Sequence, residues 1–241
     1  MPTSRFEQSL IKKLAEIETK GALKGHEKII TAIKLPENGR GPRYFIEGQG
    51  DKAFIRMNAN AYLGLARDER LVSAEEAAVR AYGTGPGAVR FISGTYQPHV
   101  ELEKQLARFH NREAAMIFSS AYATIMGLLP SFIDSETAVI SDALNHNCII
   151  NAIRLSRPLS KGIYAHLDMT ELESQIKAAL GKAKRVLIVT DGIFSMRGDY
   201  APLAAIGDLA SRYDAEFSEG ILTVVDDSHG VGAFGKTGRG T

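Results

Sequence analysis

The stretch Ile221-Leu222-Thr223-Val224-Val225-Asp226-Asp227-Ser228-His229 joins an apolar run to a polar cluster. Its first five residues are apolar or β-branched, which is typical of a strand buried on both faces of a parallel sheet. Two carboxylates, a hydroxyl and an imidazole follow directly. Because ligands of open α/β sheets bind outside the carboxyl ends of the strands, we expect the chemistry of this protein at Asp226 and His229.

The glycines after this stretch match two nucleotide-binding motifs. Gly230-x-Gly232-x-x-Gly235 fits the dinucleotide fingerprint, and Gly230-x-x-x-x-Gly235-Lys236-Thr237 fits the Walker A phosphate loop. Both motifs need glycines that run directly from a strand into a helix. Here three polar residues intervene, and each glycine after Thr237 would cost a helix about 1 kcal/mol. A P-loop NTPase therefore remains only a distant alternative.

Upstream of this stretch, apolar runs alternate with amphipathic segments. Such alternation predicts an α/β fold with a mostly parallel sheet, right-handed crossovers and helices on both faces. The predicted strands are 114–118, 137–141, 162–166, 185–190 and 221–225, and the helices between them are 122–129, 146–155, 170–180 and 202–213.

The first part of the chain has a different pattern. An amphipathic helix is predicted over 5–20, a turn-rich linker over 36–42, a short strand over 53–57 and a loop over 60–65. Ser73-x-x-Glu76 has the pattern of a capping box that opens a helix ending near Gly83. A helix over 99–110 is expected to turn Leu102, Leu106 and Phe109 inward. We divide the chain into an N-terminal segment, 1–52, and a large ligand-binding domain, 53–241.

Composition excludes several classes of protein. The 29 basic and 28 acidic residues leave a net charge of +1 without a basic block, so neither nucleic acid nor a membrane is expected as a partner. A single cysteine, Cys148, excludes a disulfide framework. The N-terminus lacks an apolar signal core, and no run reaches the length of a membrane span. We therefore expect a soluble, cytoplasmic protein, and we predict no metal site.

Polar residues follow one predicted strand after another: Ser119-Ser120, Ser141-Asp142, Asp191 with Ser195, and Asp226. Polar groups that converge on one sheet edge are typical of a cofactor pocket. The backbone amides of Ala121 and Tyr122, at the start of a helix, could bind a phosphate. The same segment also suits a serine that simply caps the helix.

Five motifs in this order resemble the α-oxoamine synthases, a family with the fold type I architecture of enzymes that use pyridoxal phosphate. They are Asn60-Ala61-Tyr62-Leu63-Gly64-Leu65, Val89-Arg90-Phe91-Ile92-Ser93-Gly94-Thr95, Ser141-Asp142-Ala143-Leu144-Asn145-His146, Thr190-Asp191-Gly192-Ile193-Phe194-Ser195-Met196 and Val225-Asp226-Asp227-Ser228-His229-Gly230. The resemblance implies a homodimer, amino acid and acyl-CoA substrates, and an incomplete large domain without the small C-terminal domain.

The resemblance also implies a role for each residue of the cofactor site. Asp226 would pair with the pyridine nitrogen, His229 would hydrogen-bond the phenolic oxygen and His146 would stack on the ring, which makes the two histidines the catalytic side chains of this chain. The remaining contacts would come from Ser195 at the ring, the amides of Ala121 and Tyr122 at the phosphate, and Asn60 at the substrate. A carboxylate against the ring nitrogen keeps that nitrogen protonated, as an electron sink requires.

The implied reaction condenses an amino acid with an acyl-CoA and releases CoA. The motifs favour glycine with a short acyl-CoA, as in glycine C-acetyltransferase; the alternative is alanine with a pimeloyl thioester, as in 8-amino-7-oxononanoate synthase. The Schiff-base lysine of the family is expected about twenty residues beyond Thr241, and Lys236 does not replace it. A protein that binds the cofactor without catalysis is a further alternative. Arg197 departs from the family, which commonly has an acidic residue there.

Overall fold

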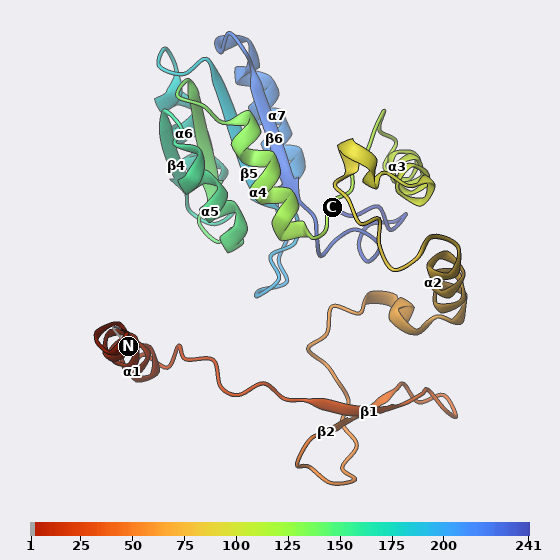
Figure 1. Ribbon diagram of the computed structural model, residues 1–241. Coiled ribbons are helices and arrows are strands. Elements are labelled where there is room, and N and C mark those ends of the chain that lie inside the picture. The colour runs from red at the N-terminus through yellow and green to blue at the C-terminus, as the bar shows by residue number, and fades with distance from the viewer. Residues whose placement is uncertain (1–2) are drawn as a thin grey trace. The chain divides into compact units, whose positions relative to one another are not determined.

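A computed structural model describes residues 3–241 and divides the chain into two compact units, residues 1–59 and residues 60–241 (Figure 1). The family-like motifs all lie in the second unit. The domain boundary predicted after residue 52 stays a prediction.

The first unit contains one helix and one hairpin. Helix α1 (Ser4–Thr19) confirms the predicted amphipathic helix. Strands β1 (Ile30–Lys34) and β2 (Arg43–Ile46) pair antiparallel, so the segment predicted as a linker, 36–42, is the connection of a hairpin. The strand predicted over 53–57 is wrong: only Phe54 forms a bridge, with Tyr44.

The second unit is built on a four-stranded parallel sheet. Its strands are β3 (Thr137–Asp142), β4 (Ser160–Tyr164), β5 (Arg185–Asp191) and β6 (Ile221–Asp226), in the order β4-β3-β5-β6. The intervening helices are α4 (Ala121–Phe132), α5 (Asn147–Ser156), α6 (Met169–Ala179) and α7 (Leu203–Tyr213). The predicted α/β fold is confirmed, with four of its five strands.

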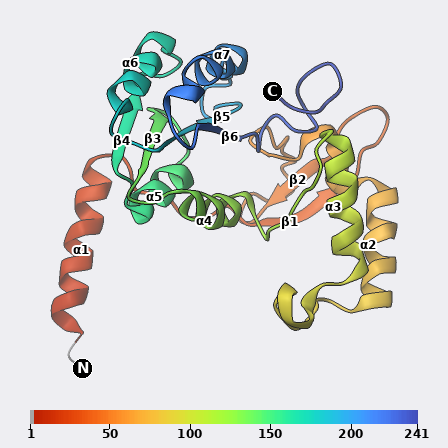
Figure 2. The same cartoon turned by 90° about the horizontal axis from the view of Figure 1, so that it is seen from above.

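The sheet has a packed core on each face because its strands send alternate residues to opposite sides. Val139 of β3 and Leu187 of β5 pack with α4 and α5, whereas Ile140 and Ile188 pack with α6 and α7. Figure 2 shows these two pairs of helices on opposite sides of the strands. The central strands are therefore fully covered, and their carboxyl ends are held in place.

Polar side chains cap the first turns of three helices of this unit. Ser120 accepts a hydrogen bond from the Ala123 amide at 3.0 Å, and Asp168 accepts one from the Glu171 amide at 2.9 Å. At the start of α5, His146 Nδ1 accepts a hydrogen bond from the Cys148 amide at 3.3 Å. These contacts satisfy amide groups that the helices themselves leave free.

The apolar run 114–118 is not a strand, contrary to the prediction. Within the described residues no strand lies beside it to accept its hydrogen bonds, and Met116 is 72% exposed. A strand exists only as a member of a sheet, so an apolar run alone is insufficient. Among the described residues, β6 pairs with β5 alone.

The helices before this run differ from the predictions in their details. Helix α2 (Glu69–Tyr82) ends before Gly83 as predicted, but it begins earlier, where Asp68 accepts a hydrogen bond from the Arg70 amide at 3.0 Å. Ser73 therefore lies inside the helix and caps nothing. Helix α3 (Gln97–Phe109) is present as expected, but Leu102 and Phe109 are exposed. The loop predicted over 60–65 forms a 3₁₀ turn, Tyr62–Arg67.

Candidate functional site

All the residues that the sequence assigns to the site line one cavity of about 220 Å³ at the carboxyl ends of the strands. They are Asn60, Ala121, Tyr122, His146, Ser195, Asp226 and His229. Cys148, Asp191, Ile193 and Ser228 complete the lining. The fold thus brings together residues separated by up to 169 positions, although their individual roles stay predictions.

Asp226 ends β6 with its carboxylate held in one orientation. Its Oδ1 atom accepts hydrogen bonds from the Ser228 amide at 3.2 Å and from the Ser228 hydroxyl at 2.5 Å. Its Oδ2 atom has a longer contact, 3.9 Å, with the Cys148 thiol. One carboxylate oxygen is therefore anchored by Ser228, and the other remains free for a donor in the cavity.

His229 is held by a residue that the sequence analysis did not select. The Tyr62 hydroxyl lies 2.6 Å from His229 Nδ1, and the two rings meet edge to face. When the phenol donates to Nδ1, the ring proton of His229 lies on Nε2. Tyr62 belongs to the quoted motif that starts at Asn60, so its position, but not its contact, was visible in the sequence.

His146 at the start of α5 and Asp191 at the end of β5 are joined by a hydrogen bond, and both line the cavity. The His146 amide donates to Asp191 Oδ2 at 3.1 Å, and His146 Nδ1 lies 2.9 Å from Cys148 Sγ. Burial raises the pKa of Asp191 to about 7, and the nearby charge of Asp226 adds to this effect. Burial and Asp226 likewise raise the pKa of Cys148 to about 11, so this thiol stays protonated at neutral pH.

The start of α4 offers donors for an anion. The Ser120 hydroxyl and carbonyl accept hydrogen bonds from the amides of Ala123 and Thr124. The amides of Ala121 and Tyr122 precede these and have no intrahelical acceptor, because the first turn of a helix leaves its N–H groups free. Ser120 is therefore a helix cap, and the two free amides remain beside the cavity.

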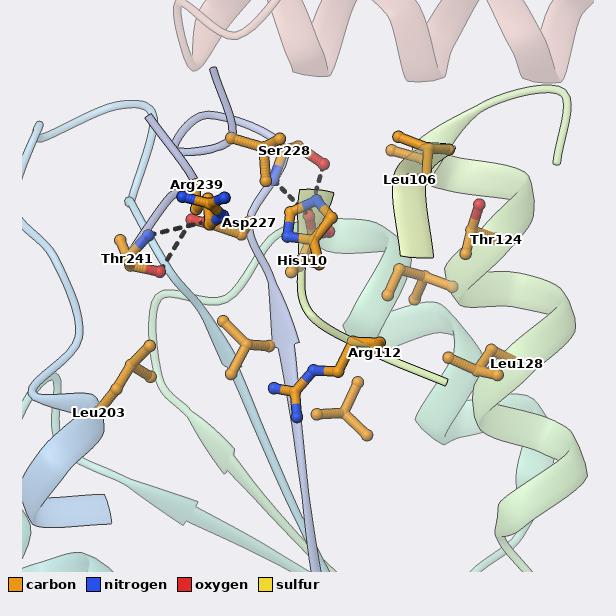
Figure 3. Close-up of a pocket in the computed structure, with 16 residues that line it drawn as sticks. Leu106, His110, Arg112, Thr124, Leu128, Leu203, Asp227, Ser228, Arg239 and Thr241 are labelled. Atoms are coloured by element: carbon orange, nitrogen blue, oxygen red, sulfur yellow. Dashed lines mark hydrogen bonds between the residues drawn. The ribbon is translucent and has the colours of Figure 1, made fainter. Parts of the chain in front are cut away.

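A second hollow, of about 760 Å³, lies on the other side of Asp226. In Figure 3, Leu106 and Leu128 face it from one side and Leu203 from the other. Asp227 accepts hydrogen bonds from the Thr241 amide and hydroxyl, both at 2.9 Å. This contact closes the glycine-rich loop of residues 230–240.

The glycine-rich loop is not a phosphate loop. Residues 230–241 form consecutive turns without a helix. A Walker A loop or a dinucleotide fingerprint needs a helix N-terminus at this point. Neither nucleotide-binding alternative therefore has the structure that it requires.

Comparisons with known proteins agree with this geometry. The family model for aminotransferase class I and II matches residues 52–240. The 8-amino-7-oxononanoate synthase 1 of Bacillus subtilis (strain 168) is 44% identical over 209 residues, which are 87% of this chain and 50% of that protein. The 8-amino-7-oxononanoate synthase of Petrotoga mobilis is 40% identical over 98% of this chain and 56% of its own.

Solved structures share the fold over nearly the whole chain. Serine palmitoyltransferase from Sphingomonas wittichii has a TM-score of 0.81 and 26% identity, covering 99% of this chain and 55% of its own. A high-resolution structure of SPT with PLP gives the same TM-score at 25% identity.

This chain spans about half the length of the curated relatives that it matches. Among its described residues, no helix combines the length and apolar character needed to cross a membrane. The match over 52–240 and the named relatives lead to one conclusion: the chain belongs to the aminotransferase class I and II family and, within it, to the α-oxoamine synthases.

Proposed function

We propose that the whole protein is an 8-amino-7-oxononanoate synthase, which joins the α-carbon of alanine to the acyl carbon of a pimeloyl thioester, with loss of the alanine carboxylate as CO2 and release of the thiol carrier. The observation that carries this proposal is the identity of 39–44% to relatives of that name. The sequence motifs alone favoured glycine with a short acyl-CoA, and the relatives support the alternative better. Short motifs around a shared cofactor reflect the chemistry that all members have in common, so they discriminate poorly between substrates.

The cavity fits pyridoxal phosphate by the chemistry of its donors and acceptors. The lining includes the free amides of Ala121 and Tyr122, which suit a phosphate. It also includes Asp226, whose Oδ2 atom suits a protonated ring nitrogen. When bound, the cofactor supplies an electron sink for a carbanion on the amino acid.

Each residue of this chain then has a physical task. The Asp226 carboxylate keeps a proton on the ring nitrogen, and Ser228 keeps that carboxylate oriented. His229 presents Nε2–H to the phenolic oxygen because Tyr62 occupies Nδ1. His146 covers the ring, Ser195 holds its edge and Asn60 meets the substrate. The resemblance places the Schiff-base lysine outside residues 1–241, so the activity is proposed for the whole protein.

Release of the thiol tests this proposal most directly. The whole protein is loaded with pyridoxal phosphate and assayed with alanine, glycine or serine, each combined with pimeloyl, acetyl or palmitoyl thioester. We expect the highest kcat/KM for alanine with the pimeloyl thioester. A clear preference for glycine with acetyl-CoA would leave the family assignment standing and refute the proposed substrates. Cofactor binding without release of thiol from any pair would favour the non-catalytic alternative.

A further inference from the structure

A charged cluster outside the cofactor cavity connects three segments at the carboxyl edge of the sheet. His166, which follows β4, lies between Asp142 at the end of β3 and Asp199 in the loop after β5. Its Nδ1 atom is 2.9 Å from Asp142 Oδ1, and its Nε2 atom is 3.2 Å from Asp199 Oδ2. The His166 side chain is 13% exposed and that of Asp142 is fully buried. None of the three residues lines the cavity.

His166 bridges two carboxylates that belong to different segments. Asp142 also accepts the amides of Leu144 and Leu167, at 2.8 and 3.0 Å, so its side chain is held in one position. Burial raises the pKa of Asp199, but the hydrogen bonds and charges of His166 and Arg197 outweigh burial and bring that pKa below its ordinary value. Each ring nitrogen of His166 therefore contacts a carboxylate oxygen of a different segment, which makes the ring a bridge between β3 and the loop after β5.

The Asp199 carboxylate makes its hydrogen bonds through one of its two oxygens. Its Oδ1 atom is buried and has no hydrogen-bond partner among the residues that the structure describes. All of its side-chain contacts therefore fall on Oδ2, where His166 and Arg197 both donate. The Arg197 side chain is 59% exposed, so its contact is the more solvated of the two and contributes less.

The loop that carries Asp199 also carries Ser195. The loop is closed by a bridge between Ile193 and Tyr200 and by a hydrogen bond from the Phe194 amide to the Asp199 carbonyl. The buried ring of Phe194 meets the His166 ring edge to face, at 4.4 Å between centroids. His166 thus contacts this loop through both of the residues that flank its exposed tip, residues 195–198.

We propose that His166 is a positioning residue that fastens the loop of residues 193–200 to the end of β3 and thereby holds Ser195 at the cofactor cavity. The part of this inference that concerns Ser195 and the cofactor rests on the proposed function. The part that concerns the loop does not, because it follows from contacts within the cofactor-free chain.

Hydrogen exchange of the whole protein without cofactor tests the fastening. In His166→Gln and in Asp199→Asn, amides of residues 193–201 should exchange roughly tenfold faster or more, because the loop loses its hydrogen bond between Asp199 and the mostly buried His166 ring. Arg197→Gln is the matched control: it removes the exposed donor to the same oxygen and should change exchange by less than about threefold. Amides of β5 serve as the reference for intact folding in every variant.

Unchanged exchange rates of the loop amides in both His166→Gln and Asp199→Asn would overturn the proposal. An equally large increase of these rates in Arg197→Gln would overturn it as well. If His166→Gln does not fold, Asp199→Asn, which keeps the shape of the side chain, decides the question alone.

Cofactor affinity tests the consequence for Ser195. Pyridoxal phosphate, followed by its absorbance, should bind His166→Gln roughly tenfold more weakly than the unmodified protein. Adding His166→Gln to Ser195→Ala should cause no further loss, because the two residues act through one contact. If His166→Gln lowers the cofactor affinity equally in the unmodified protein and in Ser195→Ala, then His166 does not act through Ser195, and the positioning role is overturned. If the unmodified protein binds no cofactor, the proposed function fails, and the exchange experiment still decides the fastening of the loop.

Discussion

Neighbouring strands of the same sheet differ sharply in this protein. Every residue of β5 from Val186 to Asp191 is buried, between β3 on one side and β6 on the other. Strand β6 has one neighbour in the described chain, and its residues are half-buried or exposed. Yet both strands end in a carboxylate at the same register, Asp191 opposite Asp226.

The two carboxylates at the ends of these strands also differ in their surroundings. The covered strand β5 supplies rigidity, and the carboxylate at its end is desolvated, so its pKa rises. The more open strand β6 presents a carboxylate that Ser228 holds as an acceptor. The two register partners therefore end in carboxylates with different surroundings.

The largest effect should come from a matched pair of leucines. Leu187 of β5 and Leu222 of β6 are register partners, with exposures of 2% and 48%. Leu187→Ala should lower the free energy of unfolding of the 241-residue chain by about 2–5 kcal/mol. Leu222→Ala should lower it by less than about 1.5 kcal/mol, because that side chain already contacts water. Urea unfolding measures both, and equal losses would contradict the contrast between the strands.

The next effect concerns the carboxylate at the end of β6. In the whole protein, Asp226→Asn should reduce kcat/KM by roughly ten- to a hundredfold or more, because an amide does not hold a proton on the cofactor ring. Steady-state assay of thiol release gives the value. Turnover like that of the unmodified protein would remove Asp226 from the ring nitrogen.

The carboxylate at the end of β5 should behave in the opposite way. The folded-state pKa of Asp191, about 7, exceeds the unfolded value of about 3.9, so folded protein binds the proton more tightly. Stability is therefore lost as the pH rises between about 4 and 7. Asp191→Asn removes this loss and should raise the free energy of unfolding at pH 8 by about 1–2 kcal/mol.

Urea unfolding at pH 4 and pH 8 checks the sign of this effect. At pH 4 the two proteins should differ little, because Asp191 is then protonated in the folded state. A variant that is less stable at pH 8 than at pH 4, by as much as the unmodified protein, would show that Asp191 is not the group responsible.

The smallest effect should come from the exposed contact next to β6. Tyr62→Phe removes the donor to His229 Nδ1 and leaves the ring in place. We expect a roughly two- to tenfold lower kcat, since a solvated hydrogen bond contributes about 0.5–1.5 kcal/mol. Nitrogen NMR shifts of His229 report its tautomer. The same tautomer in both proteins would show that Tyr62 does not select it.

Much of the second unit could be predicted from its pattern. Strands β3, β5 and β6 are short apolar runs with polar residues after them, and that order predicted the strands together with Asp226 and Ser195 of the cavity. The other predicted lining residues came from the family resemblance. The run 114–118 has the same apolar character and forms no strand. The sequence of this run is suitable for a strand. A strand also needs a neighbouring strand to pair with, however, and in a parallel sheet that neighbour comes from a distant part of the chain.

The start of helix α2 was also predicted wrongly from the local sequence. Ser73 and Glu76 have the letters of a capping box, and the helix instead starts at Glu69, because Asp68 caps it first. A motif describes which residues can cap a helix, whereas the competition between candidate caps is decided only when the chain folds.

The sequence by itself determined the alternation of strands and helices, because apolar periodicity is a local property of a chain. Its five motifs indicated the family, and the resemblance to that family indicated the residues around the cavity. The tertiary structure alone decided which of these residues hold one another. His166 reaches Asp142 and Asp199 across 24 and 33 positions, and Tyr62 reaches His229 across 167. Hydrogen bonds between such distant residues depend on the packing of whole strands, and packing follows from burial summed over the fold.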